Sequence, residues 1–364
     1  MSRLDALLEE GEKTGVFPLA RACVVVRGHP VWQGGNTPAQ TLFDLASVTK
    51  VMSTTAIALA LHACQAIDLT APLKTWLPTA RAGHVTLEDL LFHRSGLSAF
   101  LPFFAPVMVN HPRLFDADCP AEVRATARAA LVAQVLATPP LRAVGEASVY
   151  SDLGFILLGE ALSAAAKLPL DVLFGVHVEG PLGLTAQYRR ISGRPALPHS
   201  LAPTGSTRPR EPAPGQEGMW DVAARPTRAG EVDDDNAWCL DGVSGHAGLF
   251  GTAQDVARFG QAILEGQFVP PSRWAKDSRT PDSTRALGFD TPSAEGSSAG
   301  ARFGRSGPKG AIGHLGFTGT SLWIDLDREL VVSLCTNRVA LGRANVAIRD
   351  FRIRFHDAVL DALP

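Results

Sequence analysis

The alternation of apolar and polar residues predicts strands near both ends of the chain and helices between them. The stretch ARACVVVRGHPVWQGG (20–35) has β-branched residues on both sides of a turn at 28–30, which predicts a β-hairpin. The stretch SLWIDLDRELVVSLCTN (321–337) predicts a second hairpin, with its turn at 327–329. Strands near both termini favour one sheet that the two ends of the chain build together.

Helical patterns fill most of the remaining sequence. Ser2 with Asp5, and Thr252 with Asp255, have the spacing of a capping box at the start of a helix. Further helices are predicted over 86–96, 124–138, 152–167 and 344–360. Residues 99–122 are Pro-rich and predicted to be irregular, and 190–230 is predicted to be a long surface loop or a lid.

These elements predict an α/β (α+β) protein in which an antiparallel sheet is flanked by N- and C-terminal helices and carries an inserted, mostly helical domain. The predicted sheet domain is 1–60 plus 245–364, and the predicted inserted domain is 61–244, with an active site at their interface. A chain of 364 residues is long enough for one large domain or two intimately joined ones.

Composition narrows the function classes. The net charge of −2 and the scattered basic residues give no surface for nucleic acid or an anionic membrane. The N-terminus lacks the pattern of a signal peptide, and the longest apolar run, 54–67, is too short to span a bilayer. The five cysteines are widely spaced and in no metal-binding pattern. We therefore expect a cytoplasmic protein without metal or cofactor, and leave its oligomeric state open.

One lysine stands in the largely apolar helical segment 43–64. Lys50 follows Ser47 by three residues, so the two side chains share one helix face. A serine at the start of a helix lies at the positive end of the helix dipole. Burial is expected to lower the pKa of Lys50, as a base for serine requires. The alternative is a lysine that extends from a core helix to solvent.

The same Ser-x-x-Lys spacing recurs at Ser306 and Lys309, where Gly307 and Pro308 forbid a helix, so we interpret that pair as accidental. The sequence contains no His-Glu-x-x-His and no Gly-x-Gly-x-x-Gly, and Gly-x-Ser-x-Gly occurs once, at 296–300. The two absences argue against a zinc protease and a dinucleotide-binding enzyme.

Two further residues are candidates for chemistry. Tyr150, one of only two tyrosines, directly precedes the helix predicted at 152–167, although a buried tyrosine with a bonded hydroxyl is the alternative. His314 lies between glycines and leads into a strand. Free amides at such a strand edge can supply an oxyanion donor beside a serine.

In chain order, SVTK (47–50), YSD (150–152) and HLG (314–316) resemble the three motifs of the serine β-lactamase and penicillin-binding-protein superfamily. The class C-like branch, which includes esterases, D-aminopeptidases and D-alanyl carboxypeptidases, is most similar. LEDLLFHRSGL, GVSGHAGLFGTAQDVARF and GFTGTSLWIDLDRELVVSLCTNR also look familial, so the resemblance covers about 5–355. It implies a β-lactamase/transpeptidase-like fold and a small ester, peptide or β-lactam-like substrate.

The resemblance also implies roles for individual residues. Ser47 is expected to attack a carbonyl and form an acyl-enzyme, while Lys50 and Tyr150 share proton handling; which of them is the base stays open. The backbone N–H groups of Ser47 and Phe317 are expected to form the oxyanion hole. His314 replaces the usual lysine of the third motif and is expected to steer substrate and tune Tyr150.

Other positions receive weaker assignments. Gly316 belongs to the substrate-binding third motif, and His246 is a candidate for the site wall, although a packed turn suits it equally. The acidic stretch EVDDDNAW (231–238) is expected to be a solvated loop at the cleft entrance rather than a cation site. His93 and Arg94 are expected to stitch the end of a helix rather than catalyse.

Two departures from the family pattern affect the expected substrate. Asp152 stands where β-lactamases typically have asparagine; a carboxylate only accepts hydrogen bonds, so it is expected to hold Lys50 charged or bind a substrate amine. His314 offers less permanent positive charge than lysine. Both favour a carboxylic ester or a D-amino-acid amide. A class C-like β-lactamase and a catalytically silent peptide-binding or scaffold protein are the alternatives.

Overall fold

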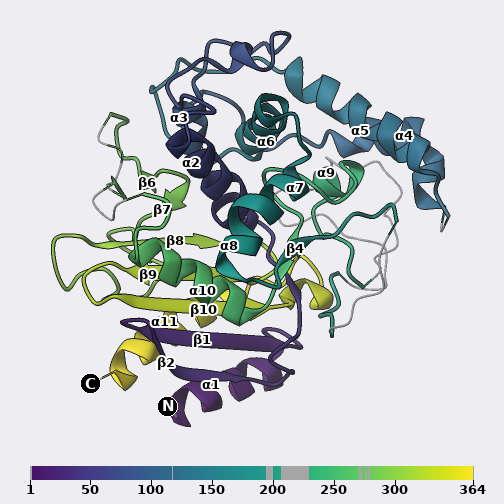
Figure 1. The fold of residues 1–364 in the computed structure, drawn as a ribbon. Helices are drawn as coiled ribbons and strands as arrows, with labels where there is room; N and C mark the ends of the chain where they lie inside the picture. Colours follow the sequence, from purple (N-terminus) through teal and green to yellow (C-terminus); the bar gives the residue numbers. More distant parts are fainter. Residues whose placement is uncertain are drawn as a thin grey trace.

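The computed structural model describes residues 2–116, 118–193, 200–205, 229–269, 273–274, 277 and 279–363. Figure 1 shows the arrangement of its helices and strands. The helices are α1 (Ser2–Lys13), α2 (Ala56–Ala63), α3 (Leu87–Leu91), α4 (Phe104–Asn110), α5 (Ala121–Leu136), α6 (Asp152–Ala166), α7 (Leu170–Phe174), α8 (Gly180–Leu182), α9 (Asp235–Cys239), α10 (Ala253–Leu264) and α11 (Ile348–Ala362). The strands are β1 (Ala20–Val26), β2 (His29–Gly35), β3 (Phe43–Asp44), β4 (Gln187–Tyr188), β5 (Leu249–Gly251), β6 (Arg285–Ala286), β7 (Phe289–Asp290), β8 (Ala311–Leu315), β9 (Ser321–Asp325) and β10 (Leu330–Thr336).

One antiparallel sheet joins the two ends of the chain, in the strand order β2-β1-β10-β9-β8-β7-β6. Both predicted hairpins are confirmed, β1–β2 and β9–β10. The pairing of β1 with β10 joins the two hairpins and places Val24 opposite Val332. The first hairpin turns one residue earlier than predicted, because Arg27 and Gly28 both adopt positive φ, as a tight two-residue turn requires.

Helices cover both faces of this sheet. Side chains alternate along β1, so Ala22 and Val24 face one apolar cluster while Cys23 and Val25 face the other. α10 packs on β1, β9 and β10 over the Cys23 face. α1 and α11 lie side by side on the other face, which places the two termini close together in Figure 1. The predicted fold class is confirmed, whereas the predicted domain boundaries at 60/61 and 244/245 stay a prediction.

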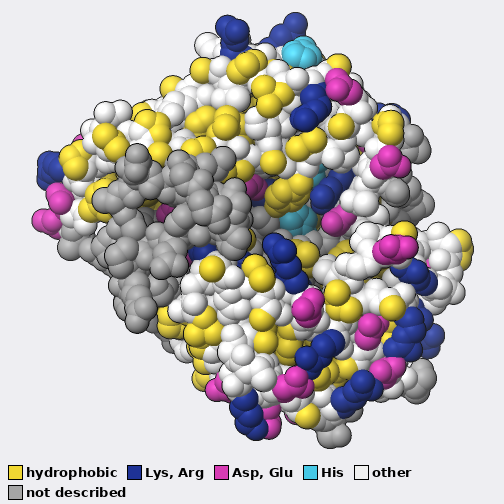
Figure 2. Space-filling model, turned by 180° about the vertical axis from the view of Figure 1, so that it is seen from behind, with side chains coloured by type: hydrophobic (Ala, Val, Ile, Leu, Met, Phe, Trp, Pro, Cys, Tyr) yellow, Lys and Arg dark blue, Asp and Glu magenta, His cyan; other side chains and the backbone are white. Residues whose placement is uncertain are grey.

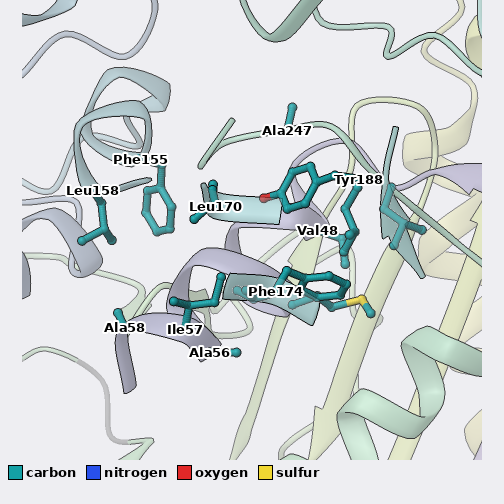
Figure 3. Close-up of a cluster of buried hydrophobic side chains, with 14 of the residues drawn as sticks. Val48, Ala56, Ile57, Ala58, Phe155, Leu158, Leu170, Phe174, Tyr188 and Ala247 are labelled. Atoms are coloured by element: carbon teal, nitrogen blue, oxygen red, sulfur yellow. The ribbon is translucent and has the colours of Figure 1, made fainter. Parts of the chain in front are cut away.

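The apolar segment after Ser47 forms the centre of the larger core. It begins as a π-helical stretch, η1 (Lys50–Thr55), and continues as α2, and every residue from 50 to 59 is buried. Figure 3 shows Ile57 of α2 among side chains of α6 and α7, including Phe155 and Phe174. The prediction that this segment is buried on all sides is confirmed for 50–59, whereas the last turn, from His62 to Cys64, is exposed.

One predicted irregular region is partly helical. Residues 104–110 form α4, although 99–122 was expected to be irregular from its prolines. Phe104, Val107 and Met108 recur at helical spacing and are buried, and Pro106 lies in the first turn, where a proline costs no helical hydrogen bond. Tertiary packing of this apolar face therefore outweighs the local proline signal.

The loop predicted over 190–230 lies largely outside the described residues. Among the helices that the structure describes, no single one has both the length and the apolar character of a membrane span. By length and composition alone, one bent pair passes this test, α6 with Leu170–Leu182, and the pair is bent by 80°. Its first member is a core helix whose side chains from Leu153 to Gly159 are all buried.

Candidate active site

Ser47 lies in a tight turn between strand β3 and the buried helix. β3 pairs with β5, which fixes the start of this segment. Ala46 then adopts a φ of 46°, a left-handed conformation that non-glycine residues rarely adopt. The Asp44 carboxylate accepts a hydrogen bond from the Ala46 amide at 2.8 Å, which stabilises the turn. Ser47 is therefore presented just before the regular helix begins.

Lys50 is completely buried directly beside Ser47. Its Nζ lies 2.9 Å from Ser47 Oγ, 2.7 Å from Asp152 Oδ1 and 3.0 Å from the backbone oxygen of His246. Lys50 opens the π-helical stretch, a wider helix that occurs frequently at functional sites. The structure thus brings the predicted serine, lysine and aspartate into one hydrogen-bonded group.

Tyr150 completes this group. Lys50 Nζ lies 4.9 Å from the centroid of the Tyr150 ring, and the Tyr150 hydroxyl interacts with Lys50 and Ser47. Its ring lies between two histidines, with centroid distances of 4.7 Å to His93 and 5.8 Å to His314. Because α6 begins right after Tyr150 with a Ser151 cap, the tyrosine and Asp152 reach the site from one helix start.

The pKa of Lys50 is raised, contrary to the sequence-based prediction. Burial by itself lowers it, but the Asp152 carboxylate and the neighbouring Tyr150 outweigh burial. The pKa of Tyr150 is also raised, chiefly by burial, although the Lys50 charge opposes this. The prediction from burial failed because it left out the carboxylate, whereas the expectation that Asp152 holds Lys50 charged is confirmed. Lys50 is therefore charged and Tyr150 neutral at neutral pH.

Two unoccupied backbone donors flank the serine. Among the described residues, neither the Ser47 amide nor the Phe317 amide donates a hydrogen bond to another protein group. The β8–β9 turn that carries Phe317 packs on the segment before Ser47, where Thr318 Oγ1 donates to the Asp44 oxygen at 2.7 Å. These amides are the pair expected to form an oxyanion hole.

Gly316 is required for this close packing. A Cβ there would lie 2.6 Å from the Leu45 oxygen and 1.9 Å from Thr320 Oγ1. Both distances are too short for any side chain. Gly316 therefore sets how closely the β8–β9 turn approaches the serine segment, and its place in the third motif has a steric reason.

His314 is buried and neutral. Its Nδ1 lies 2.9 Å from the Leu315 oxygen, which must be the acceptor, so Nε2 carries the free lone pair. Burial, assisted by the Lys50 and Arg285 charges, lowers the pKa of His314 well below its usual value. The expected lack of positive charge at this position is therefore reinforced by the surroundings.

His246 lines the cleft wall from a buried position. Its ring nitrogens lie 2.8 Å from Ser244 Oγ and 2.9 Å from Asp234 Oδ1, while its backbone oxygen accepts from Lys50. Both interpretations of His246, a packed turn and a wall residue, describe its position. Whether it touches substrate stays a prediction.

The acidic stretch 231–238 is not the solvated loop that its composition predicted. Asp233 and Asp235 are buried and form ion pairs with Arg343 at 3.2 Å and 3.0 Å. Asp234 pairs with His246. Cations that lie far away in sequence compensate these carboxylates, which is why the local pattern was misleading.

His93 lies at the end of α3 and helps to hold it, as expected, but its side chain also reaches the active site. Its Nδ1 accepts a hydrogen bond from the Ser151 amide at 3.0 Å, and its ring packs on Tyr150. Burial first, then the Arg285 and Lys50 charges, lowers the pKa of His93 well below its usual value. A neutral ring therefore holds the tyrosine in position.

The site opens into a cleft of about 520 Å³. Figure 2 shows a hollow in one face of the molecule, where a histidine and basic side chains are visible. Sequence reasoning missed several of its lining residues, because isolated arginines carry no motif. The missed arginines that line the cleft are Arg285, Arg338, Arg343, Arg349 and Arg352.

No metal centre is apparent in the described part of the chain. No group of three or more His, Cys, Asp or Glu side chains is placed to hold a metal ion there. The carboxylates of Asp152, Asp233 and Asp234, which line the cleft, are instead engaged with Lys50, Arg343 and His246.

Comparison with known proteins agrees with this geometry. The model of the Beta-lactamase family matches residues 4–353, nearly the whole chain. The chain belongs to the Beta-lactamase family. Its members share the serine-hydrolase character predicted from the three motifs, so the predicted family and enzyme class are confirmed.

Individual relatives of this Beta-lactamase-family chain are distant. An N-acetylmuramyl-L-alanine amidase of Bacillus subtilis is 29% identical, over 82% of this chain and 68% of the amidase. A Salmonella typhimurium protein, provisionally named a D-alanyl-D-alanine carboxypeptidase, is 24% identical over 85% of this chain and 71% of its own. The structure of EstCE1, described as a hydrolase with promiscuous acyltransferase activity, has a TM-score of 0.66 and 20% identity. It covers 97% of this chain and 98% of its own, which shows a shared fold.

Proposed function

We propose that this protein hydrolyses a carboxylic ester or a D-amino-acid-containing amide through an acyl-enzyme at Ser47. One observation carries the proposal: Lys50 bonds Ser47 and Asp152 at once, with Tyr150 joined to the same group. The free amides of Ser47 and Phe317 lie ready for the oxyanion. A nucleophile, a proton carrier and electrostatic stabilisation are thereby combined in one cleft.

The raised pKa values determine how the serine is activated. Because Lys50 rests charged, it first passes a proton to the Asp152 carboxylate and then accepts the proton of Ser47. Ser47 Oγ bonds to the substrate carbonyl carbon, and the oxygen that becomes negative is held by the two amides. The bond to the leaving group then breaks as Tyr150 protonates that group.

The proton balance closes within the same residues. Tyr150 recovers its proton from Lys50, and Lys50 recovers one from Asp152, so the group returns to its starting state. Water then takes the place of the leaving group and releases the acid by the reverse sequence. The Ser47 proton thus departs with the leaving group and the attacking water restores it, so no outside base is needed.

The departures from the β-lactamase pattern support the choice of substrate. Asp152, held by Lys50, cannot donate a hydrogen bond to the acylamide carbonyl of a β-lactam. Neutral His314 gives no permanent charge for a β-lactam carboxylate. The amidase and carboxypeptidase names among the relatives agree with an amide or D-peptide substrate. An ester is the simplest alternative with the same acyl-enzyme.

A labelling experiment tests the nucleophile. A fluorophosphonate is expected to add one adduct to the wild-type protein in intact-mass spectrometry, and peptide mapping is expected to place it on Ser47. Ser47→Ala is expected to show no adduct and background turnover. Ser306→Ala is the matched control, because Ser306 has the same spacing to a lysine in a non-helical loop. Full activity of Ser47→Ala without labelling of the wild type would reject the proposal.

A substrate panel tests the chemical class. p-Nitrophenyl acetate and butyrate, D-alanyl-D-alanine peptides and nitrocefin are compared at matched enzyme concentration. The esters or the D-peptides are expected to be turned over faster than nitrocefin. Nitrocefin turnover far above both would instead support a β-lactamase. Equal background rates for wild type and Ser47→Ala on all substrates would support a silent binding protein.

Location and partners are also proposals. We infer a cytoplasmic protein that acts on a small molecule and binds neither nucleic acid nor membrane, on the strength of its near-neutral charge and unclustered basic residues. Fractionation of cells that express the tagged chain tests this, and recovery in the membrane or outside the cell would contradict it.

A further inference from the structure

The turn between β8 and β9 holds the second oxyanion donor through a buried arginine. Arg352, on α11, donates hydrogen bonds from Nη2 to the Gly316 oxygen at 2.7 Å and to the Thr320 oxygen at 2.6 Å. The Gly316 carbonyl and the Phe317 N–H belong to the same peptide group. Arg352 therefore contacts the opposite end of the amide that faces Ser47.

Arg352 is an unusual choice for a merely structural contact. It is 5% exposed, and none of the described carboxylates forms an ion pair with it. Burial, together with the Arg338 and Arg349 charges, lowers its pKa to about 9. An uncompensated buried cation is costly, and a neutral donor such as glutamine satisfies a carbonyl at lower cost. The positive charge itself therefore calls for an explanation.

The other oxyanion donor provides an internal contrast. The peptide that carries the Ser47 N–H has Ala46 as its carbonyl, and that oxygen accepts from the neutral Thr49 amide at 3.0 Å. Arg338 contacts the turn as well, but its Nε donates to the Phe317 oxygen, which belongs to the following peptide. Among these contacts, only that of Arg352 places a charge on the peptide of an oxyanion donor.

We propose that Arg352 is a positioning residue of the oxyanion hole, which polarises the Gly316–Phe317 peptide and fixes its N–H toward the developing oxyanion. A charged donor on a peptide oxygen strengthens the N–H of that peptide, because hydrogen bonds in a chain polarise one another. The benefit grows with the charge on the substrate oxygen, so it is greater in the transition state than in the bound substrate. This inference rests on the acyl-enzyme proposed above.

Three variants test the role of Arg352. Arg352→Gln keeps a donor and removes the charge, and is expected to lower kcat about tenfold with KM within about twofold. Affinity for an alkyl boronic acid, which forms a tetrahedral adduct with a serine, is expected to fall by the same factor. Arg352→Lys is expected to recover part of both. Arg354→Gln, on the exposed side of the same helix, is expected to change neither.

Arg338→Gln separates polarisation from mere support of the turn. Arg338 contacts the neighbouring peptide, so this variant is expected to weaken boronic acid binding less than Arg352→Gln does. If Arg352→Gln does not fold, the acyl-carbonyl stretch of acylated wild type and Arg352→Lys is compared by infrared difference spectroscopy. A higher frequency in the lysine variant is expected, because its oxyanion hole polarises the carbonyl less.

Several outcomes would overturn the role of Arg352. They are unchanged kcat and boronic acid affinity in folded Arg352→Gln, an equal boronic acid loss in Arg338→Gln, or an unshifted carbonyl stretch. Failure of the wild-type protein to be labelled at Ser47 is a different result, since it removes the acyl-enzyme itself.

Discussion

Two buried cations, Lys50 and Arg94, are held in opposite ways. Arg94 is surrounded by carboxylates, and its guanidinium nitrogens lie 2.7 Å from Asp89, 3.1 Å from Asp277 and 3.1 Å from Glu88. Arginine keeps its proton at any ordinary pH, so these contacts form a permanent charged junction. The junction ties α3 to the chain around residue 277.

Lys50 has a single carboxylate partner and several partners that can exchange protons. Beside Asp152, it contacts the hydroxyls of Ser47 and Tyr150 and one backbone oxygen. The ammonium can release its proton to the Asp152 carboxylate, and the resulting amine can accept the proton of the Ser47 hydroxyl. The structural cation, Arg94, is therefore surrounded by opposite charges, whereas the candidate catalytic cation, Lys50, is surrounded by groups that can exchange protons.

Replacing Lys50 by arginine and Arg94 by lysine is expected to give the largest difference between the two sites in activity and stability. Lys50→Arg keeps the charge but cannot release a proton, so kcat/KM is expected to fall about 10³- to 10⁴-fold. Arg94→Lys is expected to leave kcat/KM of the folded protein within about threefold. It is expected to lower the free energy of unfolding by about 2–3 kcal/mol, because one ammonium cannot serve three carboxylates.

Ester turnover and urea denaturation of both variants measure these effects. Arg279→Lys is the control, because Arg279 binds Glu88 and Asp277 from a largely exposed position, where an ion pair contributes little. It is expected to change neither quantity. Comparable losses of activity and stability in the two main variants would contradict the contrast between the sites.

Removing the charge of Asp152 is expected to give a smaller and more specific effect. Asp152→Asn deletes a carboxylate that raises the pKa of Tyr150, so the alkaline limb of kcat/KM, where Tyr150 loses the proton that it donates to the leaving group, is expected to move to lower pH. The plateau is expected to fall about a hundredfold, because Lys50 loses its proton acceptor.

The folded state should also respond to pH in a definite direction. In the wild type, the raised Lys50 pKa contributes stability that is fully present below the ordinary lysine value of 10.5 and is lost as pH rises through the higher folded value. Asp152→Asn removes that contribution. Asp171→Asn, which removes an ion-paired carboxylate that does not line the cleft, is the matched control. An alkaline limb at unchanged pH in Asp152→Asn would contradict the assignment.

The sequence predicted what is encoded locally. The two hairpins, the capping box at Thr252 and the buried helix after Ser47 depend on short-range patterns. α4 was missed because its prolines suggested a break, while its burial depends on distant partners such as Asn236, whose Oδ1 accepts from the Phe104 amide. Long-range packing decided that element.

The active site also divides into features that local motifs predict and features that depend on long-range contacts. Ser47, Lys50 and Tyr150 were found because each sits in a motif at a fixed place relative to a helix. For Lys50 the sequence supported two opposite expectations, a pKa lowered by burial and a charge held by Asp152, because only the folded chain shows that this distant carboxylate reaches the lysine. Arg352 carries no motif at all, and its contact with the turn follows only from the packing of α11.

Asp44 sharpens the contrast further, because it is a buried carboxylate with no cation partner among the described residues. It accepts hydrogen bonds from the Ala46 and Asp233 amides, yet burial, with the charges of Asp233 and Asp234, raises its pKa to about 7. Asp277 in the Arg94 junction behaves oppositely, since hydrogen bonds and Arg94 lower its pKa despite burial.

The two carboxylates therefore give stability contributions of opposite sign. Folded Asp44 keeps its proton to about pH 7, whereas the unfolded chain releases it near 3.8, so the folded state binds more protons between these values. The free energy of unfolding is expected to fall as pH rises through this window and to level off above it. The Asp277 contribution is present above 3.8 and is lost as pH falls through its lower folded value.

Asp44→Asn is expected to flatten the fall in stability between about pH 4 and 7, because the variant has no proton to release there. The amide accepts from only one of the two backbone donors, so a uniform loss of about 1–2 kcal/mol is expected on top. Urea denaturation at one-unit steps from pH 4 to 8 measures both. Curves that run parallel for wild type and variant would show that Asp44 is ionised throughout, held by its two amide donors as firmly as Asp277 is by Arg94.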